Sequence, residues 1–249
     1  MLFVHGSGPG VTAWANWRLA LPAFAERYHV LAPDVLGFGH SDRPPAVTYN
    51  KDLWLSQLIA FLEAKAVARC HVVGNSMGGA LALALAVRRP DLVGRLVLMG
   101  STGVKFPITP GLEAVWGYKP SRDAMRTLIA DYFAYDRSIA SDNLVELRYA
   151  ASILPGFQES YERMFPPPRQ NGVDDLATPA DRIATIAAPT LLIHGREDKV
   201  IPLAVSYELL SLIPNAQLHV FGQCGHWTQI EKTAEFNAIV ATFLNGGAS

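Results

Sequence analysis

The pentapeptide Gly74-Asn75-Ser76-Met77-Gly78 decides how this chain is interpreted. An apolar run, residues 70–73, precedes it, and a run of small apolar residues, 79–87, follows it. This pattern predicts a strand, a tight turn and a helix, the setting in which a nucleophilic serine is exposed. Glycines permit the strained backbone of such a turn, and the Met77 amide at the helix start would face an oxygen that gains charge. Because one such pentapeptide can also be an ordinary turn, the interpretation depends on partners elsewhere in the chain.

A glycine-rich segment at residues 5–10, His-Gly-Ser-Gly-Pro-Gly, follows the short apolar strand predicted at residues 2–4. Backbone amides in such a turn can supply the second half of an oxyanion hole. A dinucleotide or phosphate loop is the rival interpretation, but Val11 occupies the place of the third spaced glycine and no Gly-Lys-Ser/Thr follows. A purely structural turn is the other alternative.

An acidic turn follows the apolar strand predicted at residues 189–194. Glu197 and Asp198 are both available there, and either could be a solvated loop charge. We favour Asp198, because a short carboxylate near Gly195 can hold an imidazole in one tautomer.

His226 comes after another predicted strand and a loop flanked by glycines. The order Ser76, Asp198, His226 is the nucleophile–acid–histidine order of the α/β-hydrolase fold. Cys224 could be proposed as a nucleophile, but no separate base follows it, so we interpret it as a small packing residue. The other histidines are interpreted as packing or surface residues: His5, His29, His40, His71, His194 and His219.

Composition restricts the class of protein. The chain has 249 residues, half of them hydrophobic, which is enough for one large core. A net charge of −1 with 17% charged residues argues against a nucleic-acid surface. The longest apolar stretch is far shorter than the ~20 residues that span a bilayer, so we expect no membrane association. Two cysteines and no signal-peptide pattern indicate the cytoplasm, and no metal-binding motif appears, so neither a metal nor a cofactor is expected.

Strand-like and helix-like segments alternate, which predicts an α/β fold with a mostly parallel sheet and helices on both faces. Strands are expected near residues 2–4, 28–32, 70–74, 95–100, 189–194 and 217–221, and helices near 14–27, 50–67, 77–88, 203–212 and 231–244. The alternation stops after Ser101. We therefore assign residues 1–101 and 186–249 to the core and residues 102–185 to an inserted helical cap, with helices near 121–134 and 140–153. A cap of this kind excludes water and carries specificity.

Four segments, residues 5–10, 14–17, 74–79 and 224–227, resemble the meta-cleavage product hydrolases, carbon–carbon bond hydrolases of bacterial aromatic degradation. The resemblance runs through nearly the whole chain. It is specific, because a generic esterase need not have Asn75 before the serine or Trp227 after the histidine. Cap segments 103–109 and 116–118 look most like members that act on 2-hydroxymuconic semialdehyde and its alkyl relatives.

One departure from the family concerns the N-terminus. The family has two further strands before the oxyanion loop, whereas here Met1 stands almost directly on that loop. We therefore expect the fold without its first two strands, and the strand near residues 28–32 as an unprotected sheet edge, which favours aggregation. The resemblance also implies a homodimer.

The resemblance implies hydrolysis of a 2-hydroxy-6-oxo-hexa-2,4-dienoate to a 2-hydroxypenta-2,4-dienoate and a carboxylic acid. A carbon–carbon bond needs an electron sink before it breaks, so the dienol must first become a ketone. This chemistry requires a proton shuttle, a nucleophile directed at a carbonyl, and an anion hole. His226 and Ser76 would supply the first two, and the amides of Ser7 and Met77 the third.

The resemblance also implies the groups that bind substrate. Arg148 matches the family's carboxylate-binding arginine, and its guanidinium suits bidentate pairing; a surface helix arginine is the alternative. Asn16 and Asn75 would bind the carboxylate and enol oxygens, or have only structural roles in turns, and Trp227 would pack beside them. The leaving acyl group would meet small or medium side chains, Thr102, Val173, Val200 and Ile201, and so would carry hydrogen or a small alkyl group.

Two rival functions are compatible with the same triad. A carboxylesterase or lactonase would not need Arg148. A non-catalytic small-molecule receptor could keep the triad with negligible turnover, because a fold does not determine a function.

Overall fold

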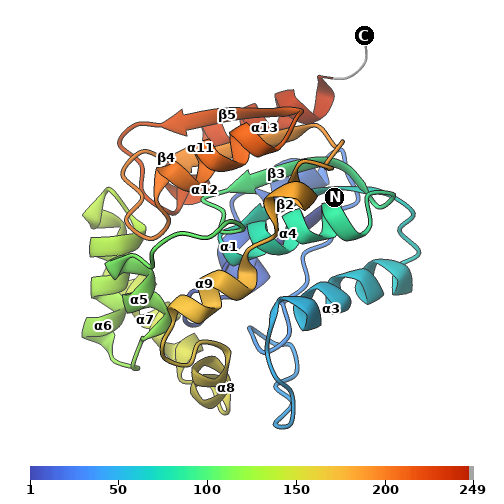
Figure 1. The fold of residues 1–249 in the computed structure, drawn as a ribbon. Coiled ribbons are helices and arrows are strands. Elements are labelled where there is room, and N and C mark those ends of the chain that lie inside the picture. The colour runs from blue at the N-terminus through green and yellow to red at the C-terminus, as the bar shows by residue number, and fades with distance from the viewer. Residues whose placement is uncertain (247–249) are drawn as a thin grey trace.

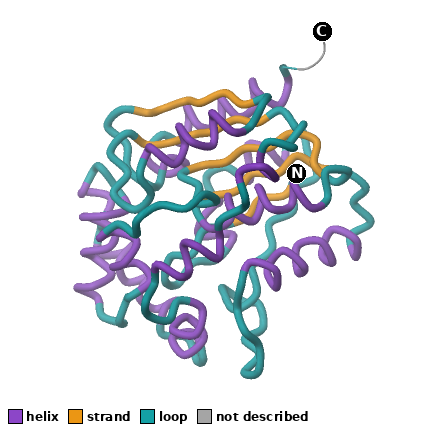
Figure 2. The backbone as a smooth tube through the Cα atoms, viewed as in Figure 1, coloured by secondary structure: helices purple, strands orange, loops and turns teal. Residues whose placement is uncertain are grey.

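The computed structural model describes residues 1–246, and a parallel β-sheet lies at their centre (Figure 1). The strands found in these residues are β1 (Leu2–Val4), β2 (Cys70–Asn75), β3 (Val93–Met99), β4 (Thr190–Gly195) and β5 (Ala216–Phe221). They lie in chain order, and each neighbouring pair is parallel. Parallel neighbours need crossover connections, and Figure 2 shows helices lying against the strands. The predicted α/β class is confirmed.

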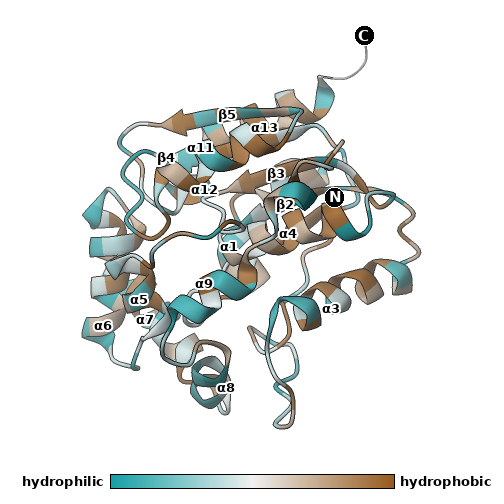
Figure 3. Cartoon of the chain, viewed as in Figure 1, coloured by the Kyte–Doolittle hydropathy of each residue, from teal (hydrophilic) through white to brown (hydrophobic). Residues whose placement is uncertain are grey.

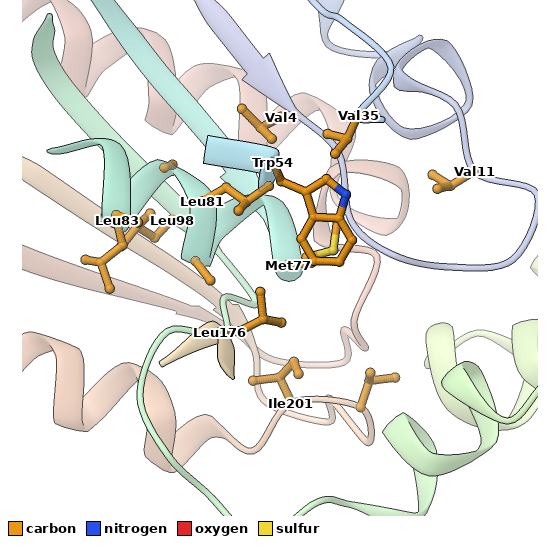
Figure 4. Close-up of a cluster of buried hydrophobic side chains, with 14 of the residues drawn as sticks. Val4, Val11, Val35, Trp54, Met77, Leu81, Leu83, Leu98, Leu176 and Ile201 are labelled. Carbon is orange, nitrogen blue, oxygen red and sulfur yellow. The ribbon is translucent and has the colours of Figure 1, made fainter. Parts of the chain in front are cut away.

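The two faces of the sheet bury different sets of side chains. Leu2 and Val4 of β1 belong to one core cluster and Phe3 to the other, because successive strand residues point to opposite faces. The first cluster includes side chains of α3 (Lys51–Ala64), α4 (Met77–Arg88) and α11 (Leu203–Leu212). The second includes side chains of α1 (Ala13–Trp17), α2 (Leu21–Ala25) and α13 (Thr233–Asn245). Figure 4 shows the first cluster, with Trp54 and Leu98 approaching α4 from different elements.

The helix α4, which begins at Met77, is buried over most of its length. Ten of its residues, from Met77 to Ala86, are buried, and Figure 3 colours most of it hydrophobic. The bounds predicted for α4 and for α11 are confirmed. The predicted helix 14–27 is instead two short helices, because Pro22 lacks an amide donor and fits only the first turn of a new helix.

The strand predicted at residues 28–32 is reduced to a single parallel bridge between Leu31 and Leu2. Phe3 N–H donates to the carbonyl of Leu31, and Leu31 N–H donates to the carbonyl of Met1, each over 2.8 Å. The segment therefore lies beside β1, which is only three residues long and offers little backbone to pair with.

The segment between β3 and β4 is helical and lies beside the sheet (Figure 1). Its elements are α5 (Pro110–Trp116), α6 (Arg122–Thr127), the π-helix η1 (Leu128–Phe133), the 3₁₀ helix η2 (Arg137–Ile139), α7 (Asp142–Ser152), α8 (Phe157–Met164), α9 (Gln170–Leu176) and α10 (Ala180–Ile183). Three of the helices begin at capping side chains, because Thr109, Ser121 and Ser141 each accept from the amide three residues later. We treat residues 102–185 as the cap, a division that stays our proposal.

Candidate active site

Ser76 lies at the turn between β2 and α4 with a strained backbone. Its φ of 55° and ψ of −119° are unusual for a residue with a side chain. The turn is possible because both flanking glycines are closely approached by backbone. A Cβ on Gly74 would lie 2.3 Å from the carbonyl oxygen of Gly78, and a Cβ on Gly78 would lie 2.3 Å from that of Val4. The predicted strand–turn–helix is thus what holds Ser76 at the carboxyl end of the sheet.

Asp198 and His226 form a buried pair. The distance from His226 Nδ1 to Asp198 Oδ2 is 2.7 Å, and a carboxylate can only accept, so Nδ1 carries the proton and Nε2 is left to act as a base. Asp198 Oδ1 accepts from the amides of Val200 and Ile201 over 2.8 and 2.9 Å. Burial raises the pKa of the Asp198 carboxyl, but the charges and hydrogen bonds of His226 and His194 outweigh it, so the pKa lies below its ordinary value. Asp198 therefore stays ionised beside the imidazole.

A second histidine touches the same carboxylate. His194 Nε2 lies 3.3 Å from Asp198 Oδ2 and 3.0 Å from the carbonyl oxygen of Ile201. Its Nδ1 lies 2.7 Å from the Ser206 hydroxyl. His194 is buried, as the packing interpretation predicted.

The glycine-rich loop, residues 5–10, lies against the turn at Ser76, and two side chains of the cap bind it. The indole of Trp116 donates to Ser7 Oγ over 2.9 Å, and the Tyr161 hydroxyl is 2.8 Å from the Ser7 carbonyl oxygen. Met77 is the first residue of α4, where an amide has no acceptor within the helix, and its side chain is in the core (Figure 4). Among the described residues, no hydrogen-bond acceptor is found for the amide of Ser7 or for that of Met77.

Arg148 of α7 is a buried cation, only 5% exposed. Its Nη2 donates to the carbonyl of Pro9 over 3.1 Å, and the guanidinium carbon lies 5.7 Å from the centre of the Trp227 ring. Within residues 1–246, its Nε has no hydrogen-bond partner and no carboxylate pairs with it. Burial lowers the pKa of Arg148 to about 10, and the charge of Arg18 adds to this effect. A buried cation with a free donor can bind an anion.

Most of the predicted site residues meet in one pocket between core and cap. Those that line it are Ser7, Asn16, Asn75, Ser76, Arg148, Val200, His226 and Trp227. Asn16 Nδ2 has no hydrogen-bond partner in the described residues, whereas Asn75 Nδ2 donates to the carbonyl of Met99. The lining includes two arginines and no Asp or Glu. The pocket is therefore suited to an anionic molecule beside a serine nucleophile.

Comparisons with known proteins show the family to which this chain belongs. Residues 1–233 match the family described as alpha/beta hydrolase fold. The chain is 57% identical to 2-hydroxymuconate semialdehyde hydrolase of Pseudomonas sp. (strain CF600), over 98% of this chain and 86% of that protein. It is 54% identical to 2-hydroxy-6-oxo-2,4-heptadienoate hydrolase of Pseudomonas putida strain F1, over 98% and 88% of the two chains. A crystallised meta-cleavage product hydrolase from Pseudomonas fluorescens IP01, complexed with acetates, superimposes with a TM-score of 0.96 at 54% identity, over 98% and 89%.

The chain belongs to the meta-cleavage product hydrolases. The family resemblance drawn from residues 5–10, 74–79 and 224–227 is confirmed at this level of identity. For a hydrolase of this family, the roles of the individual pocket residues follow from the geometry above and are proposed below.

Three residues expected to line the pocket of this hydrolase do not line it. Thr102 is buried beside the turn at Ser76, where its amide and hydroxyl donate to the carbonyl of Ser76 over 3.2 and 3.3 Å. Val173 and Ile201 are fully buried in the main core cluster, and Figure 4 shows Ile201 close to Leu176. The expectation rested on chain proximity to Asp198 and to the cap entrance. The backbone turns after Val200, so adjacent side chains face different surroundings.

Other residues line the hydrolase pocket without having been predicted. They are Val11, Ala15, Arg18, Leu112, Val115, Phe133, Leu144, Gln229 and Ile230. Most are apolar cap or helix residues that carry no motif. Only Arg18 had a usable signal, because it is a cation that directly follows segment 14–17, which resembles the family.

Proposed function

We propose that this hydrolase cleaves the C5–C6 bond of 2-hydroxy-6-oxo-hexa-2,4-dienoates, 2-hydroxymuconic semialdehyde or its 6-alkyl analogues. The products are a 2-hydroxypenta-2,4-dienoate and a carboxylic acid. The observation that carries the proposal is the pairing of a serine triad with the buried, carboxylate-free Arg148 in one pocket. A simple ester offers nothing for that cation to bind, whereas the dienoate carries a carboxylate at the far end from its scissile bond.

In the first step, the substrate carboxylate binds Arg148 and the unpartnered amide of Asn16. His226 then moves the enol proton to C5, which converts the dienol into a ketone. This step is necessary because the electrons of the C5–C6 bond need a carbonyl to receive them. The buried Asp198 keeps Nδ1 of His226 protonated, so Nε2 performs the transfer.

In the second step, Ser76 Oγ attacks the C6 carbonyl and gives its proton to His226 Nε2. The oxygen that becomes negative is stabilised by the amides of Ser7 and Met77. The C5–C6 bond breaks and its electrons pass into the conjugated ketone. The C2 enolate oxygen then takes the proton from His226, which gives the 2-hydroxypenta-2,4-dienoate. Water then hydrolyses the acylated Ser76 with His226 as base and releases the acid.

The test is an assay of the purified protein with ring-fission products. Loss of the yellow dienolate absorbance, together with formation of stoichiometric carboxylic acid, is expected. A protein that hydrolyses p-nitrophenyl esters or lactones but leaves the dienolate unchanged would be a carboxylesterase or lactonase. A protein that binds the dienolate with no turnover of any of these compounds would be a receptor.

We also propose that the enzyme is a cytoplasmic homodimer. The two free cysteines, Cys70 and Cys224, support a reducing compartment. All helices in the described residues are too short or too polar to cross a membrane. Light scattering coupled to size exclusion tests the dimer, and a mass near 27.1 kDa, that of one chain, would contradict it.

A further inference from the structure

Glu231, five residues after His226, has a carboxylate with two separate sets of partners. Oε1 accepts from the amide of Gly225 over 2.7 Å, on the loop that carries His226. Oε2 accepts from the amides of Tyr135 and Asp136 over 2.8 and 3.2 Å, in the cap segment after η1. One side chain therefore joins the histidine loop to the cap.

A second contact joins the same two segments. The carbonyl oxygen of Phe133 accepts from the amide of His226 over 2.7 Å and from that of Trp227 over 3.2 Å. The Phe133 ring also stacks on the Trp227 ring, with centroids 4.7 Å apart and planes 13° apart. The approach is so close that a Cβ on Gly225 would lie 2.6 Å from the Phe133 oxygen. The backbone of the catalytic histidine is thus bonded to the cap.

The histidine loop needs such support. It is an irregular segment after β5, and Gln223 adopts a φ of 52°, a conformation that costs energy for a residue with a side chain. Asp198 fixes the imidazole from one side only, through Nδ1. Rotation of the ring about that bond, or displacement of the loop, would move Nε2 away from Ser76.

Partial burial of the Glu231 carboxylate costs free energy, so a role in packing alone does not explain this residue. It is half-buried, and burial raises its pKa although three amides and Lys232 oppose the shift. Among the described residues no salt bridge to Glu231 is found. A glutamine could not replace it, because its amide has one oxygen and one nitrogen and cannot accept on both sides.

We propose that Glu231 is a positioning residue, which couples the seating of the cap to the placement of His226. When the cap segment moves away, the amides of His226 and Trp227 lose their acceptor, the Phe133 carbonyl, and Glu231 loses the two cap amides that hold it. The proton shuttle is then misplaced. Catalysis is then competent only with the cap seated on the substrate. This inference rests on the hydrolysis proposed above.

The experiment compares Glu231→Gln with the wild type and with Glu235→Gln, an exposed glutamate one turn further on. Turnover is measured on 2-hydroxy-6-oxohepta-2,4-dienoate and on p-nitrophenyl acetate, and is divided by the number of serines titrated with a fluorophosphonate. We expect the kcat of Glu231→Gln per titrated site to fall about 10- to 100-fold on both substrates, the scale for a catalytic group displaced by an ångström. The KM for the dienoate should change less than about twofold, because Arg148 is untouched, and Glu235→Gln should match the wild type.

Three results would overturn the inference: an unchanged kcat per site, a loss confined to KM, or a fall only in the number of titratable sites, which is what a purely structural role produces. If Glu231→Gln does not fold, Glu231→Asp, which keeps both acceptor oxygens, is measured in the same way. Failure of both to fold would make Glu231 a folding residue and would also overturn it. A wild type that turns over the ester but not the dienoate would contradict the proposed function, and the ester data would still decide the role of Glu231.

Discussion

The core and the cap contribute to the pocket in different ways. The core supplies Ser76, Asp198 and His226 from the turns after β2, β4 and β5, and the carboxyl ends of parallel strands lie at one edge of the sheet. The cap supplies Arg148. It also binds two loops of the core: Trp116 and Tyr161 bind the glycine-rich loop through Ser7, and Phe133 binds the loop that carries His226. In the proposed mechanism the core therefore carries the reacting groups, while the cap binds the substrate carboxylate and contacts the loops around it.

The nucleophile and the two loops beside it are held in place by different kinds of contact. The nucleophile is placed mainly by local backbone geometry that glycine packing enforces, and of the cap only Thr102, its first residue, donates to the Ser76 carbonyl. The oxyanion loop and the histidine loop depend on contacts from distant segments. Changes to the reacting groups of the core should abolish chemistry on every substrate. A change to Arg148 in the cap should act selectively on the dienoate, whereas a change to a cap residue that holds a core loop should slow every substrate by a smaller factor.

The largest effect is expected at the triad. Ser76→Ala should lose about a million-fold in kcat, the scale for removing one member of a cooperating triad, but should still bind the dienoate and permit its ketonisation. His226→Ala should impair both ketonisation and cleavage. Stopped-flow absorbance separates the two phases, and cleavage by Ser76→Ala at a rate near that of the wild type would disprove the nucleophile assignment.

Asp198→Asn should lower kcat by about 10⁴-fold, because an amide favours the wrong imidazole tautomer. The same substitution should also change how the stability of the fold depends on pH. The pKa of the Asp198 carboxyl is depressed in the folded protein, so its ionised form stabilises the fold at pH values above the ordinary value of 3.8 and this contribution is lost as the pH falls below it.

The Tm of Asp198→Asn should therefore lie furthest below that of the wild type at neutral pH, and the gap should narrow as the pH falls through 3.8. Thermal unfolding at several pH values measures the gap. A constant gap from pH 7 downward would mean that the carboxylate is not stabilised by its partners.

Arg148→Gln tests the cap. Leaving the substrate carboxylate without a partner in a buried site should cost about 2–5 kcal/mol, seen as a fall in kcat/KM for the dienoate. Activity on p-nitrophenyl acetate should hardly change. Arg122→Gln is the control, since this cap arginine is exposed and pairs with Glu146. Equal losses on both substrates would show that Arg148 supports the cap and does not bind substrate.

Sequence reasoning was most successful where the cause of structure is local. The bounds of α4, the parallel sheet and the turn at Ser76 all follow from short apolar runs and glycines. Reasoning was least successful in the cap, where only two helical segments were expected and α5, α8 and α9 were missed. α5 and α9 have seven residues each, which is too short for a helical period to stand out. α8 does place its buried Phe157, Tyr161 and Met164 at helical spacing, a signal that was overlooked in the sequence.

The same limit applies to the site. The triad could be found by order along the chain, because each member follows a strand. The clamp of Trp116 and Tyr161 on Ser7, and the bridge made by Glu231, join segments that only the folded chain brings together. Ile201 lies in the core and not in the pocket because the backbone turns after Val200. The sequence of neighbouring residues does not reveal such a turn.

Tyr161→Phe should have a smaller effect than the charge changes. It removes the hydroxyl that bonds the Ser7 carbonyl but keeps the ring and its packing. One lost neutral hydrogen bond is worth about 1 kcal/mol, so kcat should fall roughly fivefold as the oxyanion loop relaxes, on esters and dienoate alike. Tyr118→Phe, which loses a buried contact to Ser152, should lower stability by a similar amount and leave kcat unchanged. A wild-type kcat for Tyr161→Phe would mean that the loop needs no support from the cap.

The last prediction concerns the choice of substrate and two adjacent residues on the border between pocket and core. Val200 lines the pocket, whereas Ile201 is buried in the core cluster, although both amides bind Asp198. Together with Leu112 and Val115, Val200 leaves room for a hydrogen or a small alkyl group at the 6-position, so the wild type should prefer the 6-methyl to the 6-phenyl substrate. Val200→Ala should shift this preference towards phenyl by about 1–3 kcal/mol in relative kcat/KM, the range for one or two methylenes.

Ile201→Ala should leave the preference unchanged and destabilise the fold by about 2–5 kcal/mol, because it creates a cavity away from the substrate. The measurements are kcat/KM on the two substrates and urea unfolding for both variants. If Ile201→Ala altered the preference and Val200→Ala did not, the pocket would extend behind Val200. A wild type that favoured the phenyl substrate would contradict the small-substituent assignment itself, since a stiff β-branched side chain at the pocket wall cannot swing aside to admit a ring.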